Sequence, residues 1–325
     1  MKKLLFLPLL IIFAIAAAVA WFYISVQPVS ENKNFVYFTI PKGESAAQIG
    51  TKLESAGLIR SALAFKIYIQ FTGQSGKLQS GQFKLYPSFT LFQNVNALFN
   101  GPVEVWTTIP EGLRREEIAT RFATALGKDK AFVSEFMQVS VGKEGYLFPD
   151  TYLFPADVTA TSIVQKMTDT FNAKTSGFTP NGSNLTFAES VTLASLLERE
   201  TKTDAERPVV AGILINRLNA GIPLQVDAAV QYAVANENCK LKIENCTWWP
   251  ILSLNDLKIN SAYNTYKLVG LPPGPIANPG LSSLKAAFNP ATTDYLYYIH
   301  DSTGQIHYAK TLAEHNANVR KYLGK

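Results

Sequence analysis

The sequence predicts a protein of the α+β class, in which an apolar N-terminal helix is followed by small αβ units and then by a helix-rich domain. Three observations lead to this prediction: an uncharged apolar run near the N-terminus, a short strand–turn–helix pattern that occurs twice, and longer amphipathic helices after residue 185. Of the 325 residues, 47% are hydrophobic and 17% are charged, which excludes a disordered chain and a polytopic membrane protein. The net charge of +5 includes no repeated block of Lys and Arg, so a nucleic-acid partner is not expected.

The apolar run, from Leu4 to Ile24, follows two lysines and contains 21 residues. A helix of that length spans the ~30 Å hydrocarbon layer of a membrane. Because positively charged flanks stay in the cytoplasm, residues 25–325 would lie outside it. The alternative is a cleaved signal peptide, since Ala16–Ala20 offers a small-residue cleavage site. The length of the run and the aromatic residues at positions 21–23 favour a single-pass anchor that is not cleaved.

A strand, a turn with proline and glycine, and a helix with one apolar face are predicted twice, at residues 39–53 and 108–122. Both copies begin with the pattern Thr-Ile-Pro-x-Gly, at an offset of 69 residues. Between them, residues 78–87 alternate like a strand, and Leu91–Phe99 is predicted as a short helix that ends before a Gly-Pro pair. Two small αβ units are therefore expected.

The stretch from Gly145 to Pro155 is aromatic and is interrupted by proline. It is either a loop that fills a core or an aromatic platform for a sugar ring, with Tyr146 as one contact. The polar segment 176–184, which contains glycine and proline, marks the main predicted boundary. The predicted parts are a cytoplasmic stub and anchor at 1–24, a linker at 25–35, an αβ repeat region at 36–179 and a C-terminal domain at 180–325.

Two helices are predicted at the start of the C-terminal domain. Thr186 and Glu189 form a capping-box pattern, so the first helix is expected to begin there and to run to Thr201. The second is expected to start near Arg207 and to run to Leu218, because the Asn-Ala-Gly sequence that follows ends a helix.

Two glutamates near the end of the first helix are candidate catalytic residues. At about 100° per residue, Glu200 lies on the face that carries three leucines, and Glu198 lies on a face of smaller residues. A carboxyl group among apolar side chains has a raised pKa, which a general acid working near neutral pH requires. The alternative is that both glutamates lie at a frayed helix end, point into water and pair loosely with nearby basic residues.

Short or planar hydrogen-bonding side chains follow these helices. Gln225, Asp227, Asn264 and Tyr266 are suited to sugar hydroxyl and acetamide groups. The proline- and glycine-rich run at 270–280 cannot be a helix or a central strand, so it is expected to be a rigid loop that positions side chains. The alternative for each residue alone is a role in a turn or a helix cap.

Cys239 and Cys246 lie in a polar stretch, and in an oxidising compartment their spacing predicts a local disulfide. A metal site would need more ligands. The histidines, at positions 300, 307 and 315, lack the spacing of a metal motif, so neither a metal nor another cofactor is expected.

Five motifs follow one another through the C-terminal domain: ASLLERET at 194–201, INRL at 215–218, LQVD at 224–227, YNTY at 263–266 and GLPPGPI at 270–276. In their order, and together with the N-terminal apolar run, they resemble the MltG (YceG-like) family of membrane-anchored endolytic murein transglycosylases. The resemblance covers nearly the whole chain. The segment 236–250, which contains the cysteine pair, departs from it.

The resemblance implies one catalytic glutamate. Glu200 with Thr201 resembles the Glu-Ser pair of lysozyme-like transglycosylases, so Glu200 is the first candidate and Glu198 the second. The Thr-Ile-Pro-x-Gly units resemble the LysM-like region of the family, which is implied to hold glycan strands. The residues expected to bind substrate are Gln225, Asp227, Tyr263, Asn264, Tyr266, Asn278 and Tyr146.

The activity that the resemblance implies is cleavage of the MurNAc–GlcNAc β-1,4 bond within glycan strands, which leaves a 1,6-anhydro-MurNAc end and ends the elongation of nascent strands. The implied place is the inner membrane, with the catalytic part on the periplasmic side. The implied partners are peptidoglycan glycan strands and wall-synthesis synthases. The alternatives are a hydrolytic muramidase and a non-catalytic cell-wall-binding protein.

Overall fold

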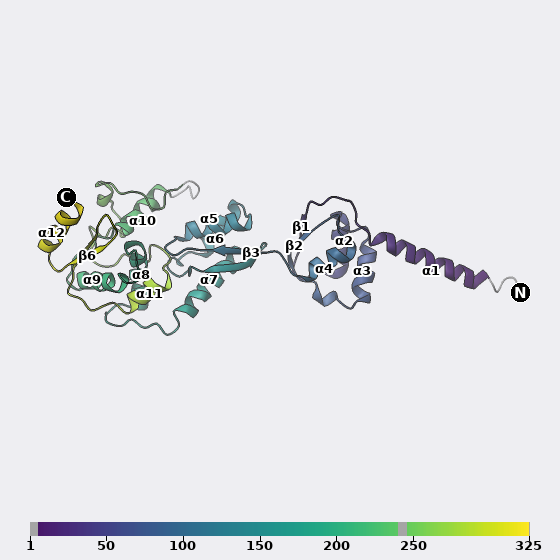
Figure 1. Cartoon of the computed structure of the whole chain (residues 1–325), viewed down its shortest axis with the longest axis horizontal. Coiled ribbons are helices and arrows are strands. Elements are labelled where there is room, and N and C mark those ends of the chain that lie inside the picture. The colour runs from purple at the N-terminus through teal and green to yellow at the C-terminus, as the bar shows by residue number, and fades with distance from the viewer. Residues whose placement is uncertain (1–5, 240–245, 325) are drawn as a thin grey trace. The chain divides into compact units, whose positions relative to one another are not determined.

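The computed structural model describes residues 6–239 and 246–324, and Figure 1 shows the order of its helices and strands. The chain divides into two compact units. The first consists of Met1–Trp106 with Leu153–Val158, and the second of Thr107–Tyr152 with Thr159–Lys325. Helices and small two-stranded sheets make up the described residues, which confirms the predicted α+β class.

The first unit contains one short sheet and a layer of helices. Strands β1 and β2 are antiparallel, with Phe38 opposite Phe83. Ser45 and Thr90 begin helices α2 and α4 with capping boxes. Apolar residues from both strands and all three short α-helices meet in one core, in which Phe65 is fully buried. The bounds are α1 Phe6–Ser25, β1 Val36–Ile40, α2 Ala46–Ser55, α3 Ala62–Phe71, η1 Ser75–Lys77, β2 Gly81–Leu85 and α4 Leu91–Phe99.

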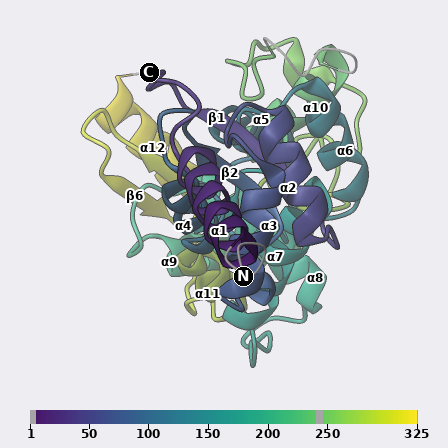
Figure 2. The same ribbon diagram turned by 90° about the vertical axis from the view of Figure 1, so that its right-hand side faces the viewer.

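Within the described part of the chain, α1 is the one helix that is long and apolar enough to cross a membrane, with Pro8–Ser25 as its apolar window. Its N-terminal end faces the viewer in Figure 2. Most of its described side chains are exposed, whereas Phe22 and the adjoining Val26 pack against the core of the first unit. The predicted apolar run is therefore a continuous helix wherever the structure describes it.

The strand–helix pattern predicted twice belongs to a longer repeat. Elements β1, α2, α3, β2 and α4 follow one another in the first copy, and β3, α5, α6, β4 and α7 follow in the same order in the second. The predicted segments 39–53 and 108–122 thus contain the end of the first strand and most of the first helix of each copy. The LysM-like character of these copies stays a prediction. The bounds in the second copy are β3 Glu104–Thr108, α5 Arg115–Leu126, α6 Lys130–Val139, β4 Thr151–Pro155 and α7 Ala160–Lys174.

Helix α8 lies at the centre of the C-terminal part of the second unit. Its residues from Ser190 to Leu197 are all buried, because α9, α10 and α11 pack around it. The capping box of Thr186 and Glu189 is confirmed, and α8 ends at Glu200, one residue before the predicted end. The bounds are α8 Phe187–Glu200, α9 Arg207–Asn219, α10 Asp227–Asn238, η2 Asp256–Lys258, α11 Leu281–Phe288, β5 Tyr297–His300, β6 Ile306–Ala309 and α12 Leu312–Leu323.

The predicted boundary between residues 179 and 180 lies inside the second unit. The buried amide of Asn278 shows why the helices of the second repeat copy and the C-terminal helices belong to one unit. Its Nδ2 donates to the carbonyl of Leu113 at 3.0 Å and to Oε1 of Glu144 at 2.7 Å, and its Oδ1 accepts from the backbone N–H of Leu147 at 2.9 Å. Segment 176–184 therefore connects α7 to α8 inside one unit.

Candidate functional site

A pocket of about 390 Å³ opens in the second unit where α8 ends and α10 begins. The end of α9, the β5 strand and α12 complete its wall. Its lining is mixed, with two carboxylates, one guanidinium and three tyrosines among a few apolar side chains. The lining residues are Glu200, Arg217, Leu224, Gln225, Asp227, Tyr266, Tyr297, Tyr298, Ile299 and His315.

Glu200 is the last residue of α8, and its side chain is partly buried in this pocket. The hydroxyl of Tyr298 donates to its Oε2 at 2.8 Å, and the backbone N–H of Ala228, near the start of α10, donates to the same carboxylate. Burial raises the pKa of Glu200 above its ordinary value, and the negative charge of Asp227 raises it further. The two hydrogen bonds and the nearby His300 oppose this rise and leave the net shift upward.

Asp227 and Tyr266 form a second hydrogen-bonded pair in the pocket. Asp227 is the first residue of α10, and the Tyr266 hydroxyl donates to its Oδ1 at 2.5 Å. Burial, followed by this hydrogen bond, raises the pKa of Tyr266, so the hydroxyl keeps its proton at neutral pH. Asp227 therefore stays an acceptor in a fixed orientation beside Glu200.

Arg217 holds a further polar side chain of the pocket, that of Gln225, by a hydrogen bond. Its Nη2 donates to the Gln225 Oε1 at 2.6 Å and to the Pro223 carbonyl at 2.7 Å, and its Nη1 donates to the Leu296 carbonyl at 3.1 Å. Gln225 has a φ of 57°, in the left-handed region that non-glycine residues rarely adopt. Such strain at a pocket is typical of a functional position.

Glu198 does not line the pocket. Its side chain is only 6% exposed, its Oε1 accepts from Nη2 of Arg207 at 3.2 Å, and its Oε2 accepts from the Gly280 N–H at 2.8 Å. Because each glutamate has its own partners and Thr201 caps α8 through the Leu197 carbonyl at 3.0 Å, the interpretation of a frayed helix end is wrong.

The other predicted substrate contacts lie outside this lining. Tyr263 packs against the Tyr232 ring with centroids 4.8 Å apart, and Tyr146 contacts Phe171 edge-on at 5.1 Å. The buried Asn264 amide donates to two backbone carbonyls and accepts from the Tyr266 N–H. Asn278, as described above, bonds the protein's own chain. Of the predicted set, the structure thus brings four side chains into the pocket: Glu200, Gln225, Asp227 and Tyr266.

Sequence reasoning missed four polar or aromatic members of the lining. Tyr297, Tyr298 and His315 come from the C-terminal hairpin and helix, about a hundred residues from α8, and the sequence offers no motif that links them to it. Arg217 lies in the INRL motif at 215–218, and its place in that motif is the sequence signal that could have identified it. Among the described residues, no group of three His, Cys, Asp or Glu could hold a metal ion.

A match to the YceG-like family covers residues 38–321. The chain belongs to the YceG-like family. An endolytic murein transglycosylase of Bacillus subtilis strain 168 is 32% identical over 328 residues, which cover 92% of this chain and 88% of that protein. One from Streptococcus pneumoniae strain D39 is 31% identical over 342 residues, and the chain spans 60% of its length. A crystal structure of a YceG-like protein from Listeria monocytogenes, 29% identical, matches 88% of this chain and 99% of that chain with a TM-score of 0.53.

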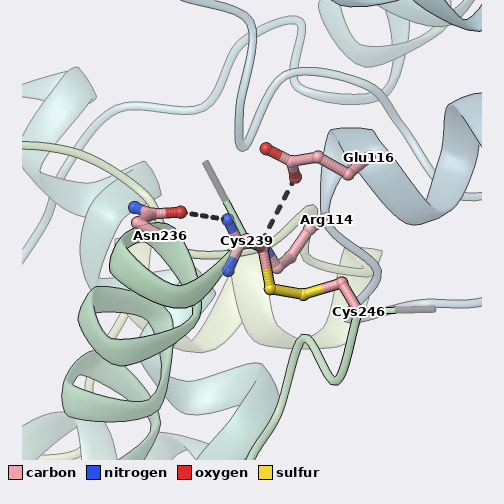
Figure 3. Close-up of a disulfide and its surroundings, with 5 residues drawn as sticks. All are labelled: Arg114, Glu116, Asn236, Cys239 and Cys246. Atoms are coloured by element: carbon pink, nitrogen blue, oxygen red, sulfur yellow. Dashed lines mark hydrogen bonds and ion pairs between the residues drawn. A yellow bond between two sulfur atoms is a disulfide. The ribbon is translucent and has the colours of Figure 1, made fainter. Parts of the chain in front are cut away.

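This YceG-like chain joins Cys239 and Cys246 in a disulfide at the end of α10 (Figure 3), and residues 240–245 between them lie outside the described part. Arg114 lies beside it, fully buried, with hydrogen bonds to Glu116 and Asn236. The Arg114 guanidinium also stacks on two aromatic rings, those of Tyr232 at 4.1 Å and Trp248 at 4.6 Å.

Trp249 extends this contact to α8. Its ring lies 3.9 Å from the guanidinium of Arg199, the residue between the two glutamates, and its Nε1 donates to Glu117 at 3.1 Å. The segment that follows the disulfide therefore packs against α5 and the end of α8 in this YceG-like chain.

Glu200→Gln is expected to stabilise the second unit at about pH 8 and to change its stability little at about pH 4. A carboxyl whose folded pKa is raised destabilises the fold when ionised, so the cost is present above that pKa and absent below the unfolded value of about 4.3. Thermal unfolding of both proteins at both pH values measures the difference, with about 2–4 °C expected per kcal/mol. A variant that melts lower at the alkaline pH would contradict the raised pKa.

Glu198→Gln is the matched variant on the other face of α8, and it is expected to destabilise the fold at about pH 8. The substitution leaves the largely buried Arg207 without its buried counter-ion, and such a loss costs about 3 kcal/mol when, as here, a second carboxylate remains nearby. Urea unfolding measures the loss. Unchanged stability would mean that the Glu198 carboxylate contributes nothing through Arg207 and Gly280.

Proposed function

We propose that this protein is an endolytic peptidoglycan lytic transglycosylase and that Glu200 is its single acid–base residue. The observation that carries the proposal is the partly buried Glu200 carboxyl, with its raised pKa, in a pocket lined by hydrogen-bonding side chains. The names of the relatives, endolytic murein transglycosylases, supply the substrate class. Because the chain spans 60% of the Streptococcus pneumoniae relative, the activity of the whole protein is itself part of the proposal.

The first step is proton donation by neutral Glu200 to the oxygen of the MurNAc–GlcNAc bond. The bond from that oxygen to C1 of MurNAc breaks, and positive charge develops at C1, where the substrate's own acetamide stabilises it. Glu200 is left as a carboxylate, which the Tyr298 hydroxyl and the Ala228 N–H stabilise because both donate to it. The negative charge of Asp227 in the same pocket favours the positively charged centre.

The second step is ring closure within the sugar. The Glu200 carboxylate accepts the proton of the C6 hydroxyl while O6 bonds to C1, which gives a 1,6-anhydro-MurNAc end and returns Glu200 to its neutral form. No water is consumed. One residue can act first as acid and then as base only when its pKa lies near the working pH, which is the direction in which burial moves Glu200.

Gln225, Asp227 and Tyr266 are proposed to orient the sugar, since their polar groups line the pocket in fixed positions. Asn264 is proposed to act indirectly, because its amide holds the loop that carries Tyr266. Asn278, Tyr263 and Tyr146 are proposed to support the fold around the site.

The proposed location is the inner membrane, with α1 as a single-pass anchor and the second unit on the periplasmic side. The apolar window of α1 and the disulfide, which is typical of an oxidising compartment, support this arrangement. An anchored enzyme that cuts within strands near the membrane would end the elongation of nascent glycans. We therefore include the wall-synthesis synthases as proposed partners.

A hydrolytic muramidase is the second candidate function, because Asp227 supplies a second carboxylate in the same pocket. A hydrolase that uses two carboxylates adds water across the bond. Its product end would therefore be heavier by one water than the anhydro end.

Glu200→Gln is expected to reduce the release of soluble fragments from purified peptidoglycan by about 10²–10⁴-fold, because no other group is proposed to transfer the proton. Mass spectrometry of the fragments from the unmodified protein is expected to show anhydro ends. Glu135→Gln, at an exposed position on α6, is the matched control and should keep full activity. Normal turnover by Glu200→Gln with loss in folded Glu198→Gln would overturn the assignment, and ordinary reducing ends would favour the muramidase.

Tyr298→Phe is expected to move the alkaline limb of the pH dependence of kcat/KM to higher pH. The Tyr298 hydrogen bond lowers the pKa of Glu200, so its removal raises that pKa, and the acid keeps its proton to a higher pH. Tyr308→Phe, which lies opposite on β6, is the matched control and should leave the limb in place. An alkaline limb that stays or moves lower in Tyr298→Phe would contradict the role of this bond.

A further inference from the structure

Helix α3 of the first unit carries an exposed apolar face. Leu63, Ile67 and Phe71 lie one turn apart, and their exposed fractions are 56%, 41% and 91%. Phe92, near the start of α4, is 40% exposed and packs edge-on against Tyr68 of α3 with centroids 5.0 Å apart. A contiguous group of large apolar side chains at a surface marks an interaction site rather than a requirement of folding.

The second copy of the repeat shows that the fold does not require this face. Helix α6 takes the place of α3 in the second copy. Its exposed residues are Lys130, Ala131, Ser134, Glu135 and Gln138, none of which is a large apolar residue. The apolar face is therefore a property of the copy that is attached to α1.

Hydrogen bonds connect the starts of α3 and α4 to the end of the apolar helix. Arg60, which precedes α3, donates from Nε to the Pro28 carbonyl at 2.8 Å, and the Leu91 N–H donates to the Val26 carbonyl at 3.0 Å. Figure 1 shows α3 on the side of the first unit where α1 ends, with β1 and β2 on the opposite side. The starts of α3 and α4 are thus hydrogen-bonded to Pro28 and Val26, which follow the window Pro8–Ser25 by one to three residues.

The charge on these two helices suits a lipid surface. The sequence of α3 contains one charged residue, Lys66, and that of α4 contains none. Lys66 is exposed and lies along one edge of the apolar face, from which its ammonium group can extend to anionic headgroups. An apolar stripe with a basic edge and no acidic side chain is typical of a helix in the membrane interface.

We propose that α3, together with Phe92, lies in the interfacial layer of the same membrane that α1 spans. The first unit then has two contacts with the lipid, a spanning helix and a surface helix. This inference rests on the proposed anchoring by α1 and is separate from the proposed activity of the second unit.

Spin labels on the full chain, reconstituted as single copies in nanodiscs of phosphatidylethanolamine and phosphatidylglycerol, test the proposal. The labels are placed at Ile67→Cys in α3, at Ile15→Cys in α1 and at Lys84→Cys in β2, and the disulfide-bonded native cysteines do not take a label. Oxygen concentrates in lipid and a nickel chelate in water. The ratio of oxygen to nickel accessibility at position 67 is expected to exceed the ratio at position 84 several-fold.

A ratio at position 67 equal to that at position 84, while position 15 reports lipid, would overturn the proposal and leave the anchor intact. Exclusion of both reagents from position 67 would also overturn it, because the face would then be covered by protein. A ratio typical of water at position 15 would instead reject the anchor.

A second variant makes the face of α3 polar: Leu63→Lys, Ile67→Ser and Phe71→Gln. Its fold is expected to be intact, because all three side chains are exposed and lie outside the core of the first unit. With a label at Phe92→Cys, the oxygen-to-nickel ratio is expected to fall several-fold, while release of fragments from soluble glycan stays unchanged. An unchanged ratio at position 92 would contradict a lipid contact made by α3.

Discussion

The Glu200 carboxyl lies where the end of α8 meets the start of α10, and the geometry of the pocket depends on this junction. Burial raises the pKa of the carboxyl, whereas the Ala228 N–H and the Tyr298 hydroxyl lower it by stabilising the charged form. The opposing effects leave a carboxyl whose pKa lies above its ordinary value and whose charged form is still hydrogen-bonded once the proton has left. A fully exposed carboxyl would not have the raised pKa, and a fully apolar environment would not stabilise the carboxylate.

The direction in which Glu200 points is set by the opposite face of the same helix. Glu198 joins α8 to Arg207 of α9 and to Gly280 at the start of α11, which fixes the rotation of α8 about its axis. The fit is close, because a Cβ at Gly280 would collide with the carboxylate of Glu111. The two glutamates therefore have different roles: Glu198 orients the helix, and Glu200 lines the pocket.

Features set by residues close together in the chain could be predicted from the sequence, whereas contacts between distant segments could not. The leucine face predicted that the Glu200 carboxyl is buried, and the capping box and the Asn-Ala-Gly stop predicted the start of α8 and the end of α9, because these signals act within a few residues. The roles of Asn264 and Asn278 could not be predicted, since an amide that binds a sugar and one that binds a backbone carbonyl need the same donors and acceptors. Tyr298 required the β5 strand to be placed against α8, which no spacing encodes.

The two repeat copies show how one βααβα scaffold can carry different exposed surfaces. Both copies bury apolar residues of their helices, and the exposed positions of α3 and α6 differ in chemical character. Substitutions at exposed positions change stability by roughly ±0.5 kcal/mol, so these faces can diverge while the cores stay constrained. In the first copy the divergent face is apolar and adjoins α1. The second copy instead buries Arg114, which precedes α5, against the ring of Trp248. The adjoining Trp249 packs on Arg199 of α8, so this copy contacts the end of α8 through the two tryptophans. One copy thus presents an apolar face on α3, and the other packs against the segment that contacts the end of α8.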